Sequence, residues 1–287
     1  GALSLSGRWR RILPMRRKLI FLDLDDTLLS SDKSVTEENR RALGQALSAG
    51  HGIAIATGRS LRGGLRVMES LGLNRKGCFL LAFHGSMIYD CGDRRQLAAE
   101  TMEESAAAEL MGRLEESGIH AQAFDGYGIV TWRESSELLR YNRIAKEPVR
   151  LAEDLSAFRE GRYFKVMAID FLDHGKLERF RRSFAPLEEG RLGSFFSNPW
   201  YLEYCKAGCD KGSGLKKLAA TLEIPVVDTV AVGDEQNDIP MTRAAGTGAA
   251  MANGCEELRR AADYVTVADQ NHSGVAEVID KFVLKNS

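Results

Sequence analysis

The 287-residue sequence lacks the features that define several large classes of protein. It has no uninterrupted apolar run near the roughly 20 residues of a membrane span, so we expect no membrane partner. It has no excess of one charge, because 39 basic residues stand against 40 acidic ones. This balance argues against a nucleic-acid partner that depends on clustered positive charge, although a local basic pocket stays open.

The sequence is also poor in cysteine, with five residues that are odd in number and spread along the chain. Cys205 and Cys209 are four positions apart, but no second Cys or His pair lies near them at zinc-site spacing. We therefore expect free thiols and no structural zinc. Free thiols fit a reducing compartment, so the predicted location is cytoplasmic.

The N-terminal segment is rich in arginine but has no long apolar segment behind it. A signal peptide needs such a segment and a small-residue cleavage site. We interpret residues 1–15 as an N-terminal extension in which Met15 is a candidate natural start. A transit peptide is the alternative.

Short apolar runs recur along the chain, each followed directly by polar or glycine residues. They are Leu19–Leu22, Ile53–Ala56, Phe79–Phe83 and Thr229–Val232. Such runs suit strands that are buried on both faces, as in a parallel sheet. Helical patterns lie between them, after the predicted N-caps Thr36 and Ser60 and over Lys211–Leu222. The alternation predicts an α/β fold with a doubly wound, Rossmann-like parallel sheet.

The middle of the chain carries none of these strand-end motifs. Helical and β-like patterns alternate there, over Glu103–Glu116, Gly128–Trp132, Ala152–Arg159 and Tyr163–Phe171. We interpret residues 89–198 as an α+β module inserted into the α/β core. The core would then comprise residues 16–88 and 199–287.

Polar side chains stand at the carboxyl ends of the predicted strands, where open parallel sheets bind ligands. They are Asp23 and Asp25, Thr57, His84 and Asp234. We expect these side chains to meet at one edge of the sheet. This convergence is the main evidence for a functional site.

Asp23 and Asp25 are two positions apart, so in an extended backbone their side chains would point roughly the same way. Two carboxylates this close repel each other unless a cation or a proton separates them. Mg²⁺ takes oxygen ligands from one or two carboxylates together with substrate phosphate. Alone, the pair favours a turn or a helix cap. The acidic loop after the fourth strand tips this balance, with Asp234 as a ligand and Asn237 and Asp238 as supporting groups.

Two further segments supply groups that suit phosphate oxygens. Thr57, followed by Gly58 and Arg59, places a hydroxyl and free N–H groups at a strand-to-helix turn. Lys211 opens a predicted helix, where its charge opposes the helix dipole unless it faces an anion. Alone, Thr57 is also compatible with a simple turn, and electrostatics leave the role of Lys211 open.

Together the four segments resemble the four motifs of the haloacid dehalogenase (HAD) superfamily. The segments are Asp23–Leu29, Thr57–Arg59, Lys211–Gly212 and Gly233–Asp238, and the last, with Met241, is similar to the pattern of the Cof-type (IIB) phosphatases. The tail is similar to the C-terminal signature of that group, over Gly248–Gly254, Ala262–Thr266 and Gly274–Ala276. The middle segment matches a C2-type cap in position and size.

The resemblance implies a Mg²⁺-dependent phosphatase that hydrolyses phosphomonoesters through an aspartyl-phosphate. Asp23 would be the nucleophile, and Asp25 the general acid and base. Thr57 and Lys211 would neutralise the phosphoryl oxygens. Mg²⁺ would be held by Asp23, the backbone carbonyl of Asp25, and Asp234.

The remaining motif residues would contact phosphate or support the site. The resemblance assigns phosphate or substrate binding to Gly58, Arg59, His84, Gly85 and Asn237. Asp238 would support Lys211 and the metal ligands.

His84 departs from the family's pattern, because Cof-type members often carry Asn-Gly-Ala where this chain has His84-Gly85-Ser86. A histidine near the phosphate would titrate close to neutral pH, and His84→Asn would then flatten the activity profile between about pH 6 and 8. The alternative is a strand-end histidine bonded to the backbone.

Specificity should lie in the inserted cap, which would close over the site. The candidate lining residues are Tyr127, Trp132, Tyr141 and Arg143, against the alternative that such aromatics form the cap core. By resemblance the substrate is a small phosphorylated metabolite, such as a sugar phosphate, flavin mononucleotide or pyridoxal phosphate. Two alternatives stay open: a phosphohexomutase of the same fold, and a non-catalytic binding protein on this scaffold. We expect a monomer or a homodimer.

Overall fold

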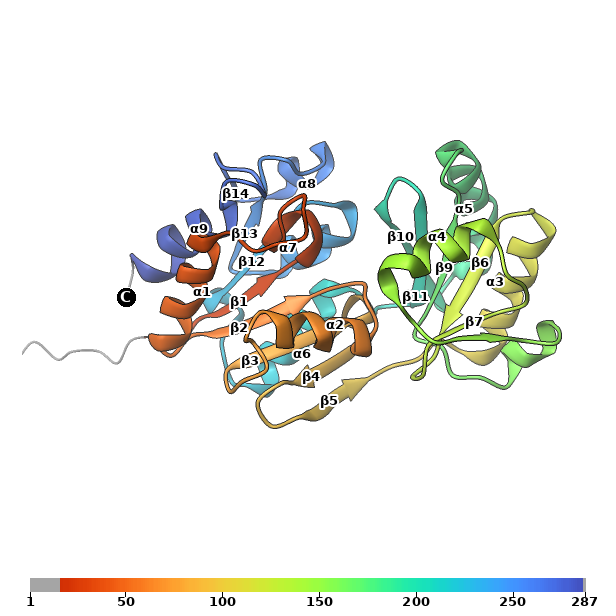
Figure 1. Ribbon diagram of the computed structural model, residues 1–287, viewed down its shortest axis with the longest axis horizontal. Coiled ribbons are helices and arrows are strands. Elements are labelled where there is room, and N and C mark those ends of the chain that lie inside the picture. Colours follow the sequence, from red (N-terminus) through yellow and green to blue (C-terminus); the bar gives the residue numbers. More distant parts are fainter. Residues whose placement is uncertain (1–15, 286–287) are drawn as a thin grey trace, which may run out of the picture.

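The structure, a computed structural model, describes residues 16–285. The predicted N-terminal extension, residues 1–15, lies outside this range. Two lobes, each built around one sheet, make up the described chain (Figure 1). None of the helices within residues 16–285 combines the length and the apolar character that a bilayer crossing requires.

The larger sheet forms the core lobe. Its strand order is β14 (Tyr264–Val265), β13 (Thr247–Ala250), β12 (Thr229–Gly233), β1 (Leu19–Leu22), β2 (Gly52–Ala56), β3 (Cys78–Ala82), β4 (Met87–Asp90) and β5 (Arg95–Ala99). The strands from β14 to β3 run parallel, and β4 and β5 continue the sheet antiparallel. The parallel order confirms the predicted doubly wound α/β core.

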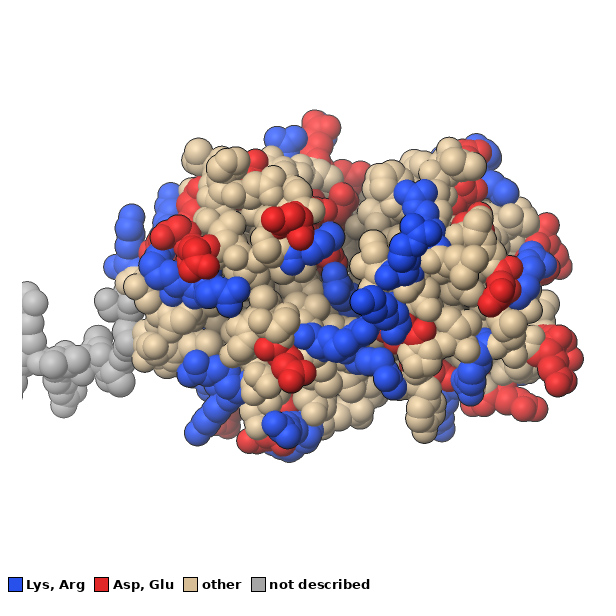
Figure 2. Space-filling view, in the orientation of Figure 1, with Lys and Arg blue, Asp and Glu red and all other residues tan. Residues whose placement is uncertain are grey.

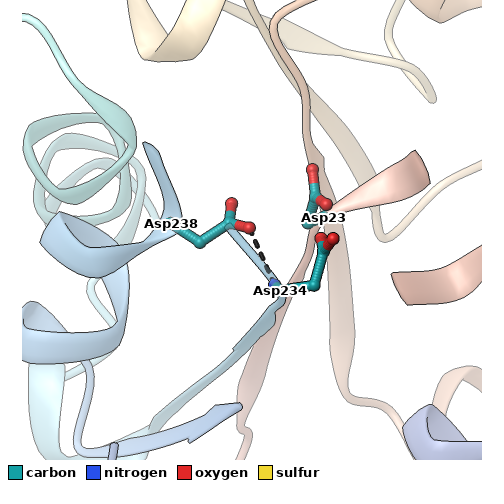
Figure 3. A group of neighbouring side chains, drawn as sticks. All are labelled: Asp23, Asp234 and Asp238. Carbon is teal, nitrogen blue, oxygen red and sulfur yellow. Dashed lines mark hydrogen bonds between the residues drawn. The ribbon is translucent and has the colours of Figure 1, made fainter. Parts of the chain in front are cut away.

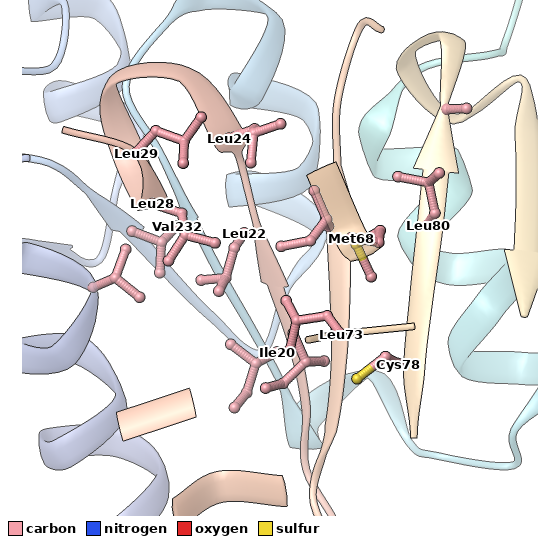
Figure 4. Packing of buried hydrophobic residues seen from close by; sticks show 14 of the residues in the cluster. Ile20, Leu22, Leu24, Leu28, Leu29, Met68, Leu73, Cys78, Leu80 and Val232 are labelled. Atoms are coloured by element: carbon pink, nitrogen blue, oxygen red, sulfur yellow. The ribbon is translucent and has the colours of Figure 1, made fainter. Parts of the chain in front are cut away.

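Helices cover both faces of this sheet. They are α1 (Glu37–Ser48), α2 (Leu61–Ser70), α6 (Lys211–Thr221), α7 (Ile239–Ala244), α8 (Glu256–Ala261) and α9 (Gly274–Ile279). The side chains of β1 alternate between the two layers, because successive residues of a strand point to opposite faces. Ile20 and Leu22 pack with α1, α2 and α9 (Figure 4), whereas Leu19 and Phe21 pack with α6 and α7. This double burial explains the uninterrupted apolar runs of the sequence.

The predicted helix starts are confirmed by their capping contacts. The Thr36 hydroxyl accepts from the backbone N–H of Asn39 at the start of α1, and the Ser60 hydroxyl accepts from Gly63 N–H at the start of α2. Each contact satisfies one N–H group that would otherwise lack a partner in the first helical turn.

The smaller sheet forms the cap lobe. Its strand order is β10 (Leu192–Asn198), β11 (Tyr201–Lys206), β9 (Lys165–Ile169), β6 (His120–Phe124), β7 (Ile129–Thr131) and β8 (Val149–Leu151). The helices α3 (Glu104–Glu116), α4 (Ser136–Ala145) and α5 (His174–Glu188) accompany it. The predicted helical stretch over 152–159 is only a short 3₁₀ turn, Leu155–Arg159.

The boundaries of the cap differ from the predicted range 89–198. Strands β4 and β5 pair onto β3 and belong to the core sheet, whereas β10 and β11 belong to the cap sheet. The insert therefore lies between Ala99 and Lys206. Sequence pattern identifies a strand but not the sheet that it joins, so both boundaries were placed about ten residues too early.

The central strand predicts a stability contrast. Ile20 on β1 is fully buried between the sheet and the helices that cover it, so Ile20→Ala should lower the free energy of unfolding by about 2–5 kcal/mol. Leu172 is 97% exposed, so Leu172→Ala should change it by less than about 0.5 kcal/mol. Denaturant unfolding measures both values, and a similar loss in the two variants would contradict the packing described.

Candidate active site

The sheet brings the predicted acidic residues together. Asp23 follows β1 and Asp234 follows β12, its parallel neighbour, so the two side chains start from adjacent strand ends. Asp238 lies on the short turn that follows Asp234. One carboxylate oxygen from each of the three residues lies within 4.8 Å of the others (Figure 3). The convergence that the strand ends predicted is therefore present.

Lys211 is buried between two of these carboxylates. Its Nζ donates to Oδ1 of Asp23 at 2.8 Å and to Oδ1 of Asp238 at 2.7 Å. Burial lowers the pKa of the Lys211 ammonium, but the two carboxylates raise it by more, so the net pKa lies above its ordinary value. Asp210 and Ser213 form a capping box that starts α6 and fixes Lys211 at its first residue. The charge of Lys211 is therefore permanent in this site.

Asp238 uses both carboxylate oxygens within the protein. Oδ1 accepts from Lys211, and Oδ2 accepts from the backbone N–H groups of Asp234 at 2.9 Å and Glu235 at 3.1 Å. Burial, reinforced by the charge of Asp23, raises the pKa of Asp238 to about 6 against the opposing effect of Lys211. These contacts suit a residue that supports the site from behind rather than a direct metal ligand.

Asp23 and Asp234 face each other with one hydroxyl between them. Thr27 Oγ1 lies 2.9 Å from Oδ1 of Asp234 and 3.3 Å from Oδ2 of Asp23. Burial raises the pKa of Asp234 well above its ordinary value, and the charges of Asp23 and Asp238 raise it further. One hydroxyl proton cannot neutralise two buried carboxylates. Their oxygen atoms fit a hard divalent cation, which would relieve this repulsion.

The side chain of Asp25 lies apart from this group. The segment Leu24–Leu28 folds back on Asp23 as a closed loop, in which Asp25 has extended angles (φ −68°, ψ 129°) and Asp26 is left-handed at φ 58°. Asp23 and Asp25 are thus both extended, but the Asp25 carboxylate is not among the three that converge. The Asp25 carboxylate pairs with Arg59 at 2.8 Å and Lys33 at 3.1 Å. Burial raises the pKa of Asp25, but these two cations lower it by more, so the net pKa is below its ordinary value.

A cavity of about 530 Å³ separates the acidic group from the cap. Its core side includes Asp23, Asp25, Thr57, Asp234 and Asn237, and its cap side includes Tyr141, Lys165, Asn198, Tyr201 and Glu203. Basic side chains gather near the boundary between the two lobes on the face shown in Figure 2. The volume suits a small metabolite. A second hollow, lined by Arg181, Asp210 and Arg243, includes neither Asp23 nor Asp234.

Thr57 and its neighbours form one wall of this cavity. Thr57 is buried, and its Oγ1 accepts from the backbone N–H of Arg59 at 3.1 Å. Gly58 is required by a close approach, because a methyl group there would overlap the His84 ring. Gly85 does not line the cavity. It has φ 91°, and a side chain there would meet the carbonyl of Asp210.

The His84 ring is buried and makes no hydrogen bond to the described backbone. Nε2 lies 2.9 Å from Oε1 of Glu203, although poorly aligned for a hydrogen bond, and Nδ1 lies 3.4 Å from Nδ2 of Asn237. Burial lowers the pKa of His84 against the opposing charge of Glu203. The contacts favour a packing role over a titrating one.

Of the four predicted cap residues, only Tyr141 lines the cavity. Tyr127 is 78% exposed, Trp132 packs on Phe158 in the cap core, and Arg143 is exposed outside the cavity. The lining residues Lys33, Lys165 and Glu203 were not predicted. No sequence signal marked them, whereas Thr27 stands inside the first motif and could have been included.

A family model described as haloacid dehalogenase-like hydrolase matches residues 20–279, nearly all of the described chain. The chain belongs to the haloacid dehalogenase-like hydrolase family. Phosphatase YwpJ of Bacillus subtilis is 30% identical over 91% of this chain and 98% of its own length. The 5-amino-6-(5-phospho-D-ribitylamino)uracil phosphatase YcsE of the same organism is 28% identical over 93% of this chain and 96% of its own length.

Among solved structures, the HAD subclass IIB sugar phosphatase BT4131 superposes with a TM-score of 0.78 at 20% identity. The match covers 92% of this chain and 98% of that one, so this HAD hydrolase shares the complete core-and-cap fold of subclass IIB. The predicted family and the predicted enzyme class, a phosphatase of this family, are confirmed.

The raised carboxyl pKa values predict how Mg²⁺ affects the stability of this hydrolase. With the folded pKa of Asp238 near 6 and that of Asp234 also raised, the metal-free fold loses stability as pH rises from about 4 through these values. A divalent cation binds ionised carboxylates in preference to protonated ones, so added Mg²⁺ should raise the melting temperature more at about pH 7.5 than at about pH 5. Thermal unfolding with and without Mg²⁺ measures the difference. Asp234→Asn should abolish it, and an unchanged Mg²⁺ effect in that variant would count against the site.

Because Gly58 packs on the His84 ring, a smaller residue at position 84 should restore part of the activity that a substitution of Gly58 removes. Gly58→Ala should lower activity roughly tenfold or more, because its methyl group overlaps the buried ring. Gly58→Ala combined with His84→Ser should recover part of the loss, since the smaller side chain leaves room. Steady-state rates of the two single variants and the double variant decide this, and independent, multiplying losses would contradict the steric account.

Proposed function

We propose that this protein is a Mg²⁺-dependent phosphomonoesterase that hydrolyses small phosphorylated metabolites through an aspartyl-phosphate at Asp23. The observation that carries the proposal is the environment of Asp23. Its carboxylate is held by Lys211, faces Asp234, and lines the same cavity as Thr57. A nucleophile, a cation site and phosphate-binding donors thus share one enclosed space.

In the first step, a carboxylate oxygen of Asp23 attacks the phosphorus and the bond to the leaving oxygen breaks. Asp25, which lines the same cavity, enters this step protonated and donates the proton that the leaving alcohol needs. Lys211 and the Thr57 hydroxyl stabilise the negative charge on the phosphoryl oxygens. The products of this step are the free alcohol and the aspartyl-phosphate.

In the second step, a water molecule attacks the phosphorus of the aspartyl-phosphate. Asp25, now ionised, accepts the proton of that water. The bond between phosphorus and Asp23 breaks, which releases inorganic phosphate and regenerates the Asp23 carboxylate. Asp25 pairs with Arg59 and Lys33, and these contacts favour its ionised form, which is the form that accepts the proton in this step. The proton that Asp25 takes from water here is the one that it donates to the leaving alcohol in the next turnover.

Mg²⁺ fits this oxygen donor set, and Asp23, Asp234 and the backbone carbonyl of Asp25 would hold it. When bound, it would neutralise charge that develops on the phosphoryl group. Lys211 and Asp238 hold Asp23 and the Asp234 backbone in place, so the ligands are oriented before substrate arrives.

The cap side of the cavity supports a polar, hydroxylated leaving group. Tyr141, Tyr201, Ser197 and Asn198 present hydroxyl and amide groups there, and Met167 adds an apolar surface. This mixture suits a polyol or sugar phosphate. The relative YcsE is named for a phosphoribityl compound, which belongs to the same chemical class. A panel of such phosphates is the direct way to identify the substrate.

The nucleophile can be tested by one substitution. Asp23→Asn should lower Mg²⁺-dependent hydrolysis of p-nitrophenyl phosphate by at least about a thousandfold, because the amide cannot form the intermediate. Asp93→Asn, at an exposed turn of the core, should leave the rate unchanged. Equal rates in Asp23→Asn and the wild type would refute the assignment. Conversion of a phosphohexose without phosphate release would instead indicate a mutase.

A further inference from the structure

Two charged side chains are buried on the cap side of the cavity and have no part in the chemistry above. Lys165 on β9 and Glu203 on β11 expose 1% and 2% of their side chains. Their Nζ and Oε1 atoms lie 2.8 Å apart. A buried ion pair contributes little net stability, because the desolvation of both charges offsets their attraction. Packing alone therefore gives no reason for this pair.

The contacts of Lys165 cross from the cap to the core. Its Nζ donates to the backbone carbonyl of Gly58 at 2.6 Å. Gly58 follows Thr57 in the loop that forms one wall of the cavity. A cap side chain thus holds the backbone of the predicted phosphate-binding loop.

The bond from Lys165 fixes the orientation of one peptide group. The carbonyl of Gly58 and the N–H of Arg59 belong to the same planar trans peptide, so they point in opposite directions. The carbonyl faces Lys165, and the N–H donates to Thr57 Oγ1 at 3.1 Å. This peptide is therefore held at both ends, by the cap on one side and by Thr57 on the other.

The N–H of Arg59 also orients the Thr57 hydroxyl. Because Oγ1 accepts this bond with one lone pair, its own proton is left to donate elsewhere. Thr57 lines the cavity, so the free proton is available to a phosphoryl oxygen. Rotation of the Gly58–Arg59 peptide would remove this arrangement.

Two further cap contacts fall on the same region. Glu147, which is buried, accepts a hydrogen bond from the Ser60 hydroxyl that caps α2. Glu203 lies against His84, whose ring packs on Gly58. The cap therefore contacts the loop from Gly58 to Ser60 and the ring that packs against it.

We propose that Lys165 is a positioning residue: it orients the Gly58–Arg59 peptide from the cap and thereby aims the Thr57 hydroxyl at the phosphoryl group. The inference rests on the proposed function. It means that the cap completes the phosphate site whatever the leaving group is, in addition to enclosing it.

The test removes both buried charges at once. Lys165→Met combined with Glu203→Gln leaves no unpaired charge in the interior, so the fold should persist. We expect kcat to fall roughly tenfold or more with KM little changed, because the lost interaction acts on the transferring phosphoryl group. The loss should be equal for methyl phosphate and for a hexose phosphate, since Lys165 does not act through the leaving group.

The same changes in a Thr57→Val background show whether the loss of kcat acts through the Thr57 hydroxyl. With Thr57→Val already present, the same two changes should cost less than about twofold, because the hydroxyl that Lys165 positions is gone. Lys165→Gln with Glu203→Gln keeps one donor near Gly58 and should recover part of the rate. If the methionine variant does not fold, the kcat of this glutamine variant is compared between the Thr57 and the Thr57→Val backgrounds instead.

Lys176→Met is the matched control. Lys176 also donates to a glycine carbonyl, that of Gly118 at 3.3 Å, but within the cap and outside the cavity, so its removal should leave kcat unchanged. An unchanged kcat in the Lys165 variants overturns the inference. A loss of kcat confined to the hexose phosphate also overturns it, because it would mean direct contact with the leaving group. A loss of kcat that is just as large in the Thr57→Val background overturns it as well. Absence of Mg²⁺-dependent hydrolysis in the wild type would refute the proposed function itself.

Discussion

The buried ammonium of Lys211 is the interaction on which the rest of the site depends. Its position at the first residue of α6 opposes the helix dipole, and burial removes its water. Only the carboxylates of Asp23 and Asp238 make that position stable. These residues come from β1, from the loop after β12 and from α6, so the ion pairs exist only when all three elements are packed. The catalytic lobe and its charge arrangement are therefore built by the same contacts.

The three carboxylates carry more negative charge than Lys211 alone compensates. Burial and, after it, the charge of Asp23 raise the pKa of Asp234, because both disfavour its ionised form. A divalent cation between these carboxylates would relieve their mutual repulsion. The cap adds a second arrangement of buried charge opposite the first. Lys165 and Glu203 bring the two lobes into contact at the loop that carries Thr57.

Much of the core site follows from the sequence because it obeys one geometric rule. Asp23, Thr57 and Asp234 each come directly after an apolar run, and the carboxyl ends of parallel strands meet at one edge. Lys211 could be identified by a different signal, because a cation at the start of a helix opposes the helix dipole unless it faces an anion. The side chain of Asp25 could not be placed from spacing, because the chain closes a loop back onto Asp23 and Asp25 pairs with Arg59 from another loop. The contacts of His84 were equally hidden, since Glu203 lies on a strand far away in sequence.

The cap was the harder part for a different reason. Its residues Lys165 and Glu203 are single charged residues within mostly apolar, buried strands, and the strand pattern does not tell that their side chains meet the other lobe. The boundaries 89 and 198 depended on which sheet each strand joins, which is a tertiary choice. Trp132 and Tyr127 illustrate the remaining ambiguity of aromatic residues, because one packs in the cap core and the other is exposed.

Asp23 should become covalently phosphorylated during turnover. Acid quenching of the enzyme with Mg²⁺ and a sugar phosphate, followed by borohydride reduction and peptide mass spectrometry, tests it directly. Borohydride reduces an acyl phosphate to the alcohol, so an aspartyl-phosphate at Asp23 should give homoserine at position 23 and unchanged aspartate at position 25. Two results would contradict a phosphorylated Asp23. One is homoserine at position 25, and the other is unmodified Asp23 in enzyme that was quenched while it hydrolysed the substrate at steady state.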